Sequence, residues 1–476
     1  MEEFVSLGEW WLPNNPEVVV AGKLSFSPNS GAKLELIGSF YNWPFQDTGK
    51  VKDLSLENNN LLSEDSRITQ ENITFDYIKP EETIILGRLQ NNEEITLYKC
   101  SGSMSSVGLV EIEKANFLFK ATYIFRKIHF KTEQNIKFNS ISVRYPNLEE
   151  WIGKSGIQVM WSREENRIWI SYQPPSSIPI AEFKGLDMSV TFLPIYINPL
   201  DIYFGATYYK ANVEQKTFLT LNNPQKQSID KCFETIVSFR DFLTLGMSNP
   251  SSVSAVMGNV DITSEKSILK EDGSYSFEEV TLESKVNILF AFGDSGKNSE
   301  TKVFLHEMLF IYNDIEGNLG EVFKQWLHKK ETYESVFGLF MITMYTSDLY
   351  LHYHFLNIIQ ALEVYHRIKY KKKEAYLKTR LREILKDITH LLPDNFIGGA
   401  NDRESFIERA VITRNALTHH SKKEKAAKSE ELAQLFYTLK VILQSCLLQE
   451  LSFTNESINK LIERNRNSLK EWRLPN

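Results

Sequence analysis

Cysteine is scarce in this 476-residue chain, and a long apolar run is missing. Cys100, Cys232 and Cys446 lie far apart, so the sequence offers neither a disulfide framework nor a cysteine-rich zinc cluster. We expect buried thiols in a reducing cytoplasm. The longest uncharged apolar stretch, residues 335–347, has 13 residues, whereas a membrane-spanning helix needs about 20. The acidic start, Met1-Glu2-Glu3, lacks a signal peptide's basic region. The sequence therefore predicts a cytoplasmic protein without a membrane segment.

Charge is divided unevenly along the chain. Residues 1–300 carry a net charge of −11, and residues 301–476 carry +4. Within residues 351–428, 16 basic residues face 9 acidic ones, a net charge of +7. Such a basic segment favours contact with a polyanion such as RNA. Ordinary solvated helix faces are the alternative interpretation.

The pattern of apolar residues changes once along the chain, near residue 300. Short β-rich runs separated by turn signals fill residues 1 to about 220, which predicts a sandwich or barrel with one added helix at 227–245. The polar segment 293–300 is the predicted linker. Beyond it we expect helices at 302–312, 317–330, 332–345, 349–371, 374–392, 401–419, 427–452 and 454–466. The predicted domains are a β-rich domain, 1–300, and an α-helical bundle, 301–476.

The hexapeptide Arg414-Asn415-Ala416-Leu417-Thr418-His419 carries the chemistry that is easiest to recognise. An arginine can hold a scissile phosphate, and a histidine that titrates near neutral pH can exchange protons with a ribose hydroxyl. Five residues apart, the two side chains lie about 140° from one another around an ideal helix. A helix that ends near His419 would let the long arginine side chain reach the same phosphate. The alternative is that Arg414 pairs with an acidic neighbour and His419 interacts with the helix dipole.

Polar residues around this hexapeptide are further candidates. Asn415 can orient a phosphate or an imidazole. Glu363 and His366, one turn apart, can form a metal-ligand pair, a support for the catalytic helix, or a surface pair. Because no further ligands cluster nearby, we predict neither a metal nor a cofactor. Candidate RNA-binding residues are Lys369, Lys371, Lys372, Lys373, His420, Lys422 and Lys423.

The order of three segments resembles a known domain. A "QALE-x-x-H-R" helix at 354–367 precedes a basic amphipathic segment at 377–385, and "T-R-N-x-L-T-H" follows at 413–419. This order is similar to the HEPN nuclease domain of ApeA-type bacterial antiphage proteins, over about residues 340–450. Residues 22–26 and 142–151 resemble the all-β amino-terminal domain of the same family.

The resemblance implies a function and a set of roles. It implies a metal-independent endoribonuclease with His419 as general acid and base, Arg414 on the phosphate, and Glu363 as a support facing the catalytic helix. Cleavage would leave a 2′,3′-cyclic phosphate and a 5′-hydroxyl. It further implies a homodimer or a higher symmetric oligomer, a β-rich sensor domain answering a phage-derived activator, and a role in abortive infection. The alternative is a non-catalytic HEPN protein that binds RNA or a protein partner, with the β domain recognising a ligand.

Overall fold

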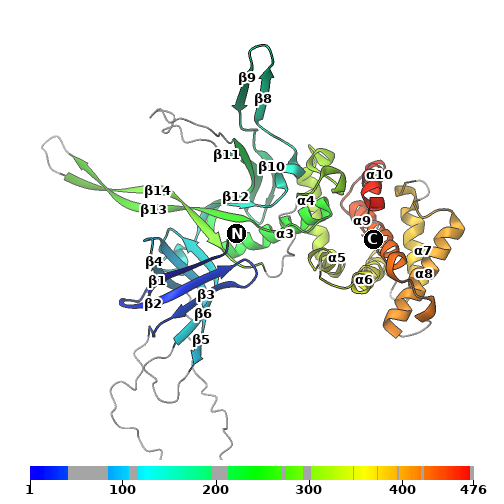
Figure 1. Cartoon of the computed structure of the whole chain (residues 1–476), viewed down its shortest axis with the longest axis horizontal. Coiled ribbons are helices and arrows are strands. Elements are labelled where there is room, and N and C mark those ends of the chain that lie inside the picture. Colours follow the sequence, from blue (N-terminus) through cyan, green and yellow to red (C-terminus); the bar gives the residue numbers. More distant parts are fainter. Residues whose placement is uncertain are drawn as a thin grey trace, which may run out of the picture. The chain divides into compact units, whose positions relative to one another are not determined.

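The computed structural model describes residues 1–40, 84–106, 116–195, 213–269, 275–292, 302–346, 348–372, 374–393, 396–419 and 423–471. The chain forms two compact units, which are residues 1–136 with 286–291, and residues 137–285 with 292–476. The predicted linker, 293–300, lies outside the described residues, and the predicted boundary near residue 300 stays a prediction. The β-rich amino-terminal part and the helical carboxy-terminal part that the sequence predicts are confirmed (Figure 1).

The first unit is built on a closed antiparallel barrel of six strands. They are β1 (Phe4–Leu12), β2 (Asn15–Ser27), β3 (Gly31–Leu36), β4 (Ile84–Leu89), β5 (Glu94–Ser106) and β6 (Asn116–Arg126). Their order is β6-β3-β2-β1-β4-β5, and β5 pairs with β6 again, which closes the barrel.

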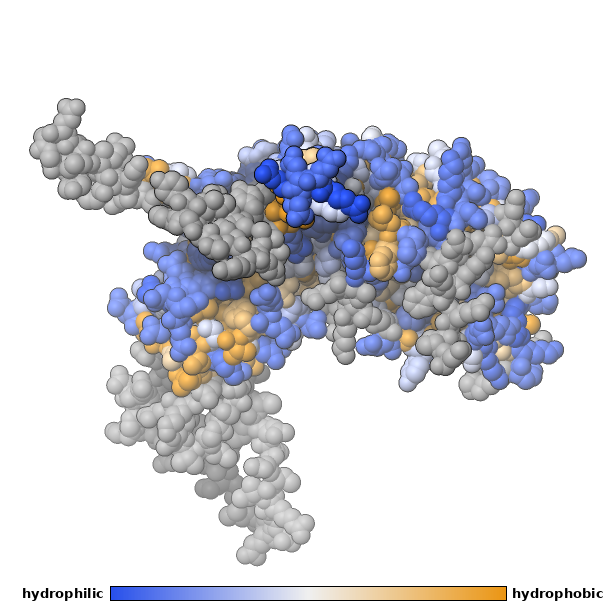
Figure 2. All heavy atoms as spheres, turned by 45° about the horizontal axis from the view of Figure 1, so that its top comes forward, coloured by the Kyte–Doolittle hydropathy of each residue, from blue (hydrophilic) through white to orange (hydrophobic). Residues whose placement is uncertain are grey.

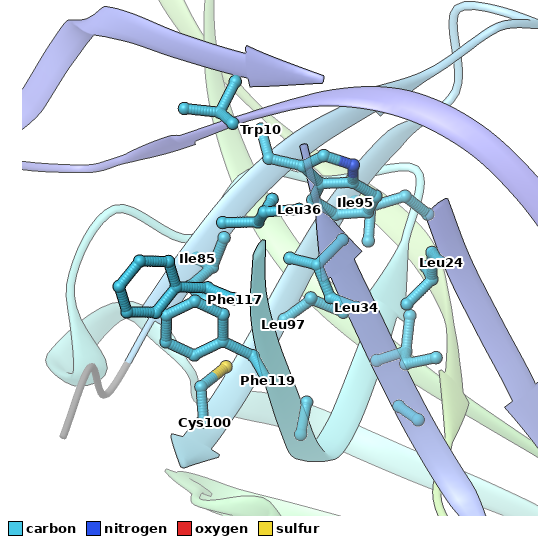
Figure 3. Packing of buried hydrophobic residues seen from close by; sticks show 14 of the residues in the cluster. Trp10, Leu24, Leu34, Leu36, Ile85, Ile95, Leu97, Cys100, Phe117 and Phe119 are labelled. Atoms are coloured by element: carbon cyan, nitrogen blue, oxygen red, sulfur yellow. The ribbon is translucent and has the colours of Figure 1, made fainter. Parts of the chain in front are cut away.

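The barrel interior is filled by side chains that alternate along each strand, as a half-buried strand requires. Trp10, Leu34 and Leu97 are almost fully buried there (Figure 3). Gly87 makes room for the largest of them, because a Cβ at this position would lie only 2.2 Å from the Trp10 ring. The barrel is therefore a packed core and not a channel.

The second unit combines a sheet with the α-helices of the described residues. Its strands follow the order β10 (Ile178–Phe183), β11 (Leu186–Ile195), β12 (Glu214–Gln227), β7 (Phe138–Arg144), β13 (Ala255–Leu269) and β14 (Tyr275–Leu289), and the end of β14, from residue 286, belongs to the first unit. The added helix is α3 (Ile229–Met247), and a short helix, α1 (Leu148–Ile152), precedes a separate two-stranded hairpin, β8 (Ile157–Ser162) and β9 (Arg167–Tyr172).

In the described residues, seven α-helices form the carboxy-terminal part of this unit. They are α4 (Leu319–Thr332), α5 (Glu334–Tyr345), α6 (Leu351–Lys369), α7 (Leu377–Ile388), α8 (Ala400–His419), α9 (Ser429–Glu450) and α10 (Asn455–Glu471). Helix α6 contacts α5, α7, α8 and α9, and it buries Phe355, Ile358 and Leu362 among them. None of the described helices has the length and the hydropathy that crossing a bilayer requires. In Figure 2, polar side chains cover most of the visible described surface, and apolar ones gather in separate spots.

The predicted helix at 302–312 is wrong. The structure has two 3-10 turns there, Leu305–Glu307 and Tyr312–Ile315. Between them the backbone of Phe310 is bound by distant parts of the chain: its N–H donates to the Gly246 carbonyl at 3.0 Å, and its carbonyl accepts the Trp151 indole N–H at 2.8 Å. An α-helix over residues 302–312 would need the Phe310 N–H for the carbonyl of residue 306. Tertiary contacts therefore replace the local hydrogen bonds that the apolar spacing suggested.

Candidate active site

Helix α8 carries Arg414 at the border of its buried side. The helix buries Ile407, Ala410, Thr413 and Ala416, which follow one another at three-residue steps. The Thr413 hydroxyl also accepts the Ala427 N–H at 3.0 Å, which fixes the chain that returns after α8. Arg414 follows this buried threonine, and its side chain is 28% exposed. The buried side of α8 therefore positions the motif backbone, whereas the Arg414 side chain is partly exposed.

The guanidinium of Arg414 is oriented by two polar neighbours. Its Nη1 donates to Asn415 Oδ1 at 3.1 Å, and its Nη2 lies 3.4 and 3.5 Å from the carboxylate oxygens of Glu363 on α6. The contact with Glu363 is longer than an ordinary charge-assisted hydrogen bond of about 2.7–2.9 Å. Arg414 is thus aimed by α6 without being tightly bound, and its planar fork can take a phosphate.

His419 is the last residue of α8, and its side chain is exposed. No hydrogen bond joins this imidazole to another side chain or backbone group of the described residues. Because α8 is helical up to His419, the five-residue spacing turns the two motif side chains about 140° apart. The helix ends where the sequence predicts, but the two groups do not share one face of α8.

His366 lies in a different environment from Glu363, although one helical turn separates them. Arg380 Nη1 donates to His366 Nδ1 at 3.0 Å, so the ring proton belongs on Nε2, which donates to Glu383 at 2.7 Å. The imidazole is fully buried and stacks on Tyr370. Hydrogen bonds to Lys372 and His366 hold the pKa of the Glu383 carboxyl below its usual value. His366 thus joins α6 to α7.

This arrangement decides against a Glu363–His366 metal pair. The Glu363 carboxylate contacts Arg414, whereas both ring nitrogens of His366 are engaged by Arg380 and Glu383. Among the residues that the structure describes, no cluster of three metal-ligating side chains occurs.

The candidate RNA-binding residues fall into three groups. Lys369 pairs with Glu450 at 2.5 Å and Lys372 with Glu383 at 2.7 Å, so both ammonium groups already have carboxylate partners. Lys371 is exposed just beyond the end of α6. Lys373, His420 and Lys422 lie outside the described residues, and the side chain of Lys423 is not described either.

Two family models match the sequence of this chain. Residues 6–326 match the model described as ApeA N-terminal domain 1, which is more than half of the chain. The chain belongs to the ApeA family. Residues 356–457 match the Apea-like HEPN model, as the sequence predicts, and this segment includes Glu363, Arg414 and His419. Searches of curated proteins and of solved structures found no match. The two domains together indicate a nuclease-like protein of antiphage defence.

A buried ion cluster between α4 and the ApeA HEPN region was not foreseen from the sequence. The Glu450 carboxylate on α9, 4% exposed, accepts from Lys329 of α4 at 2.6 Å, from Lys369 at 2.5 Å and from the Tyr365 hydroxyl at 3.2 Å. Burial alone would raise the pKa of Glu450, but the two ammonium groups outweigh it and hold the pKa below its usual value. The sequence signal for this cluster is weak: Glu450 ends a helix whose last turns, from Val441, are otherwise uncharged.

The next residue of α4 makes a second buried ion pair. Lys330 lies 2.9 Å from Asp241 of α3, which also accepts from Arg240 at 2.8 Å and from the Tyr345 hydroxyl at 3.0 Å. Asp241 belongs to the segment that matches ApeA N-terminal domain 1, and Glu450 belongs to the HEPN match. Two adjacent lysines of α4 therefore link the two matched regions.

Proposed function

We propose that this ApeA-family protein is a metal-independent endoribonuclease of an abortive-infection system. The observation that carries the proposal is Arg414, which lies in an intact Arg-x4-His motif within the HEPN match and is oriented by Glu363 and Asn415. A partly exposed guanidinium, with one ordinary hydrogen bond to Asn415 and only long contacts with Glu363, is suited to bind a phosphate that arrives from solvent.

The proposed reaction needs two proton transfers and no external reagent. The 2′-hydroxyl of RNA loses its proton to an imidazole, and its oxygen attacks the adjacent phosphorus. The bond from phosphorus to the 5′-oxygen breaks, and that oxygen takes up a proton. The products are a 2′,3′-cyclic phosphate and a 5′-hydroxyl. His419 exchanges the protons, and Arg414 stabilises the charge on the phosphoryl oxygens.

The 140° separation of the two side chains on α8 favours a symmetric oligomer. The family resemblance implies that two motifs face each other, so the His419 imidazoles of two copies can serve as base and acid on the same phosphate. Each copy supplies one Arg-x4-His motif, and a twofold axis between two copies brings their two motifs together. We propose a homodimer, or a larger oligomer built from such dimers.

Cleavage is expected to persist in excess EDTA, because the described residues hold no cluster suited to a catalytic ion. The measurement is cleavage of total cellular RNA with and without the chelator, followed by analysis of the product ends. Products should carry a 2′,3′-cyclic phosphate and a 5′-hydroxyl. A strict requirement for a divalent ion, or 3′-hydroxyl products, would contradict the mechanism. RNA that is bound but never cut, even with phage extract added, would favour the non-catalytic alternative.

The ApeA amino-terminal domain is proposed to hold the nuclease inactive until a phage-derived activator binds. The acidic charge of residues 1–300 disfavours RNA binding there, and the α4 lysines provide a physical link to the HEPN region. A chain cut at residue 301 is a poor test, because α4 would lose Asp241 and also the Ser238 carbonyl that accepts the Trp326 indole N–H at 3.0 Å. The full-length chain is preferable.

Lys330→Ala in the full-length chain is expected to slow host growth in the absence of phage, because it releases α4 from α3. Asp241 keeps Arg240 and the Tyr345 hydroxyl as partners, so its carboxylate is not left alone. The measurement is growth after induced expression at matched protein levels. Lys324→Ala, an exposed position on the same helix, is the matched control. Growth defects that survive His419→Ala, or that the control shares, would disprove inhibition through this link.

A further inference from the structure

The hairpin of β8 and β9 forms a sheet of its own (Figure 1). Its central cross-strand pairs are Val159 with Ile170, Met160 with Trp169, and Trp161 with Ile168. All residues of both strands are exposed or half-buried. Two strands alone are marginally stable in water, and three strands or a packing partner are normally needed.

The two faces of the hairpin differ sharply in chemistry, because side chains alternate along each strand. One face, called the apolar hairpin face, consists of Ile157, Val159, Trp161, Ile168, Ile170 and Tyr172. The opposite face consists of Gln158, Met160, Ser162, Arg167, Trp169 and Ser171. On the apolar hairpin face, Trp161 is 62% exposed and Ile168 is 67% exposed. None of the six residues is charged, and the one charged group found near them in the described residues is the Arg163 guanidinium, which lies over the Trp161 ring at 5.6 Å from its centroid.

Such a face calls for a partner. Contiguous exposed apolar patches of a few hundred Å² mark interaction sites in folded proteins. The apolar hairpin face has six residues, far fewer than the roughly 20–30 residues per side of a typical stable interface. We therefore expect this face to form a small interface in an oligomer that is also held together by a second, separate interface.

The charges at the hairpin tip help to choose the partner. Arg163, Glu164, Glu165 and Arg167 balance one another. An anionic lipid surface or a nucleic acid would attract a basic excess, which this tip does not have. A second apolar hairpin face brings no charge conflict, and two sheet faces pack about 10 Å apart with interdigitating side chains. The identical surface on another copy is complementary in these respects.

We propose that the apolar hairpin faces of two copies of this chain pack against each other. The contact goes beyond the proposed nuclease function and does not depend on it. The middle row, Val159 and Ile170, lies at the centre of the contact, with the Trp161 row on one side and the Ile157 row on the other. The contact is isologous, so one twofold axis relates its two halves.

The test compares two double substitutions in the same hairpin of the full-length chain. Trp161→Thr with Ile168→Thr removes one cross-strand pair from the apolar hairpin face. Met160→Thr with Trp169→Thr removes the neighbouring pair from the opposite face. Sedimentation equilibrium should show self-association weakened about tenfold or more by the first change and little altered by the second. Thermal melts report whether both variants fold.

A crosslinking experiment gives a second readout that leaves the apolar face largely intact. Val159→Cys should be joined to its counterpart by a short bis-maleimide, whereas Gln158→Cys, on the opposite face, should not. The native cysteines are all buried. Equal self-association of the two double variants, together with no crosslink at residue 159, would overturn the proposal. Loss of binding to lipid vesicles or RNA in the first variant, with unchanged self-association, would overturn it too. His419→Ala should associate like wild type, which separates this proposal from the nuclease proposal.

Discussion

Replacing His419 or Arg414 by alanine is expected to lower the rate of RNA cleavage by about 10²–10⁴, since loss of a positioned acid or base, or of the charge that stabilises the transition state, costs this much. The fold should persist. His419 is exposed at the end of α8, and Arg414 makes only long contacts with Glu363. The measurement is single-turnover cleavage, with the melting temperature recorded for each variant.

Two further variants sharpen this experiment. Arg414→Lys keeps the charge but loses the planar fork, so its activity should stay close to that of the alanine variant. His328→Ala, exposed on α4, removes a histidine that has no role in the mechanism and should cut like wild type. Undiminished cleavage by the Arg414→Ala, His419→Ala double variant would exclude this motif as the active site.

Glu450→Ala is expected to destabilise the protein by about 3–5 kcal/mol, the usual effect of removing one partner from a buried ion cluster. The Glu450 carboxylate on α9 is 4% exposed and binds Lys329 of α4 and Lys369 and Tyr365 of α6. Its loss therefore removes the ionic contacts that join these three helices. Glu450→Gln should cost less, because its amide oxygen can still accept from the tyrosine. The measurement is urea denaturation. Glu456→Ala, which removes an exposed carboxylate paired with Lys460 on α10, is the control and should leave the midpoint unchanged.

The pH dependence of this difference follows from the pKa of Glu450, which lies below its usual value. A carboxyl whose folded pKa is depressed stabilises the fold above its unfolded pKa, and this contribution is lost as the pH falls through the folded pKa. The stability gap between wild type and Glu450→Gln should therefore be full near neutral pH and shrink in acid. A gap that keeps its neutral-pH size throughout the acid range would show that Glu450 is not ionised in the fold.

Several features could be predicted from sequence alone because they depend on neighbours along the chain. The apolar spacing at 227–245 and at 349–371 indicates a buried helix face, and the structure has helices there, Ile229–Met247 and Leu351–Lys369. Alternating strands with turn signals indicated the β-rich part, and the family model confirms the resemblance to ApeA. The motif at 414–419 is itself a sequence pattern. The roles of its residues stay predictions, because the structure fixes their positions and not their chemistry.

Other features were decided only when distant segments met. Residues 302–312 have helical spacing, but the tertiary hydrogen bonds of Phe310 keep the chain extended. Spacing alone left Glu363 and His366 as a possible pair; folding turned one toward α8 and bound the other to α7. Lys369 looked like part of a solvated charge run, yet it ends on a carboxylate 81 residues away. Local periodicity shows which side of an element is buried, whereas the partner of a buried charge depends on which helix packs there. The sequence therefore determined most of the elements and the motif, and the tertiary structure decided which basic side chains have carboxylate partners.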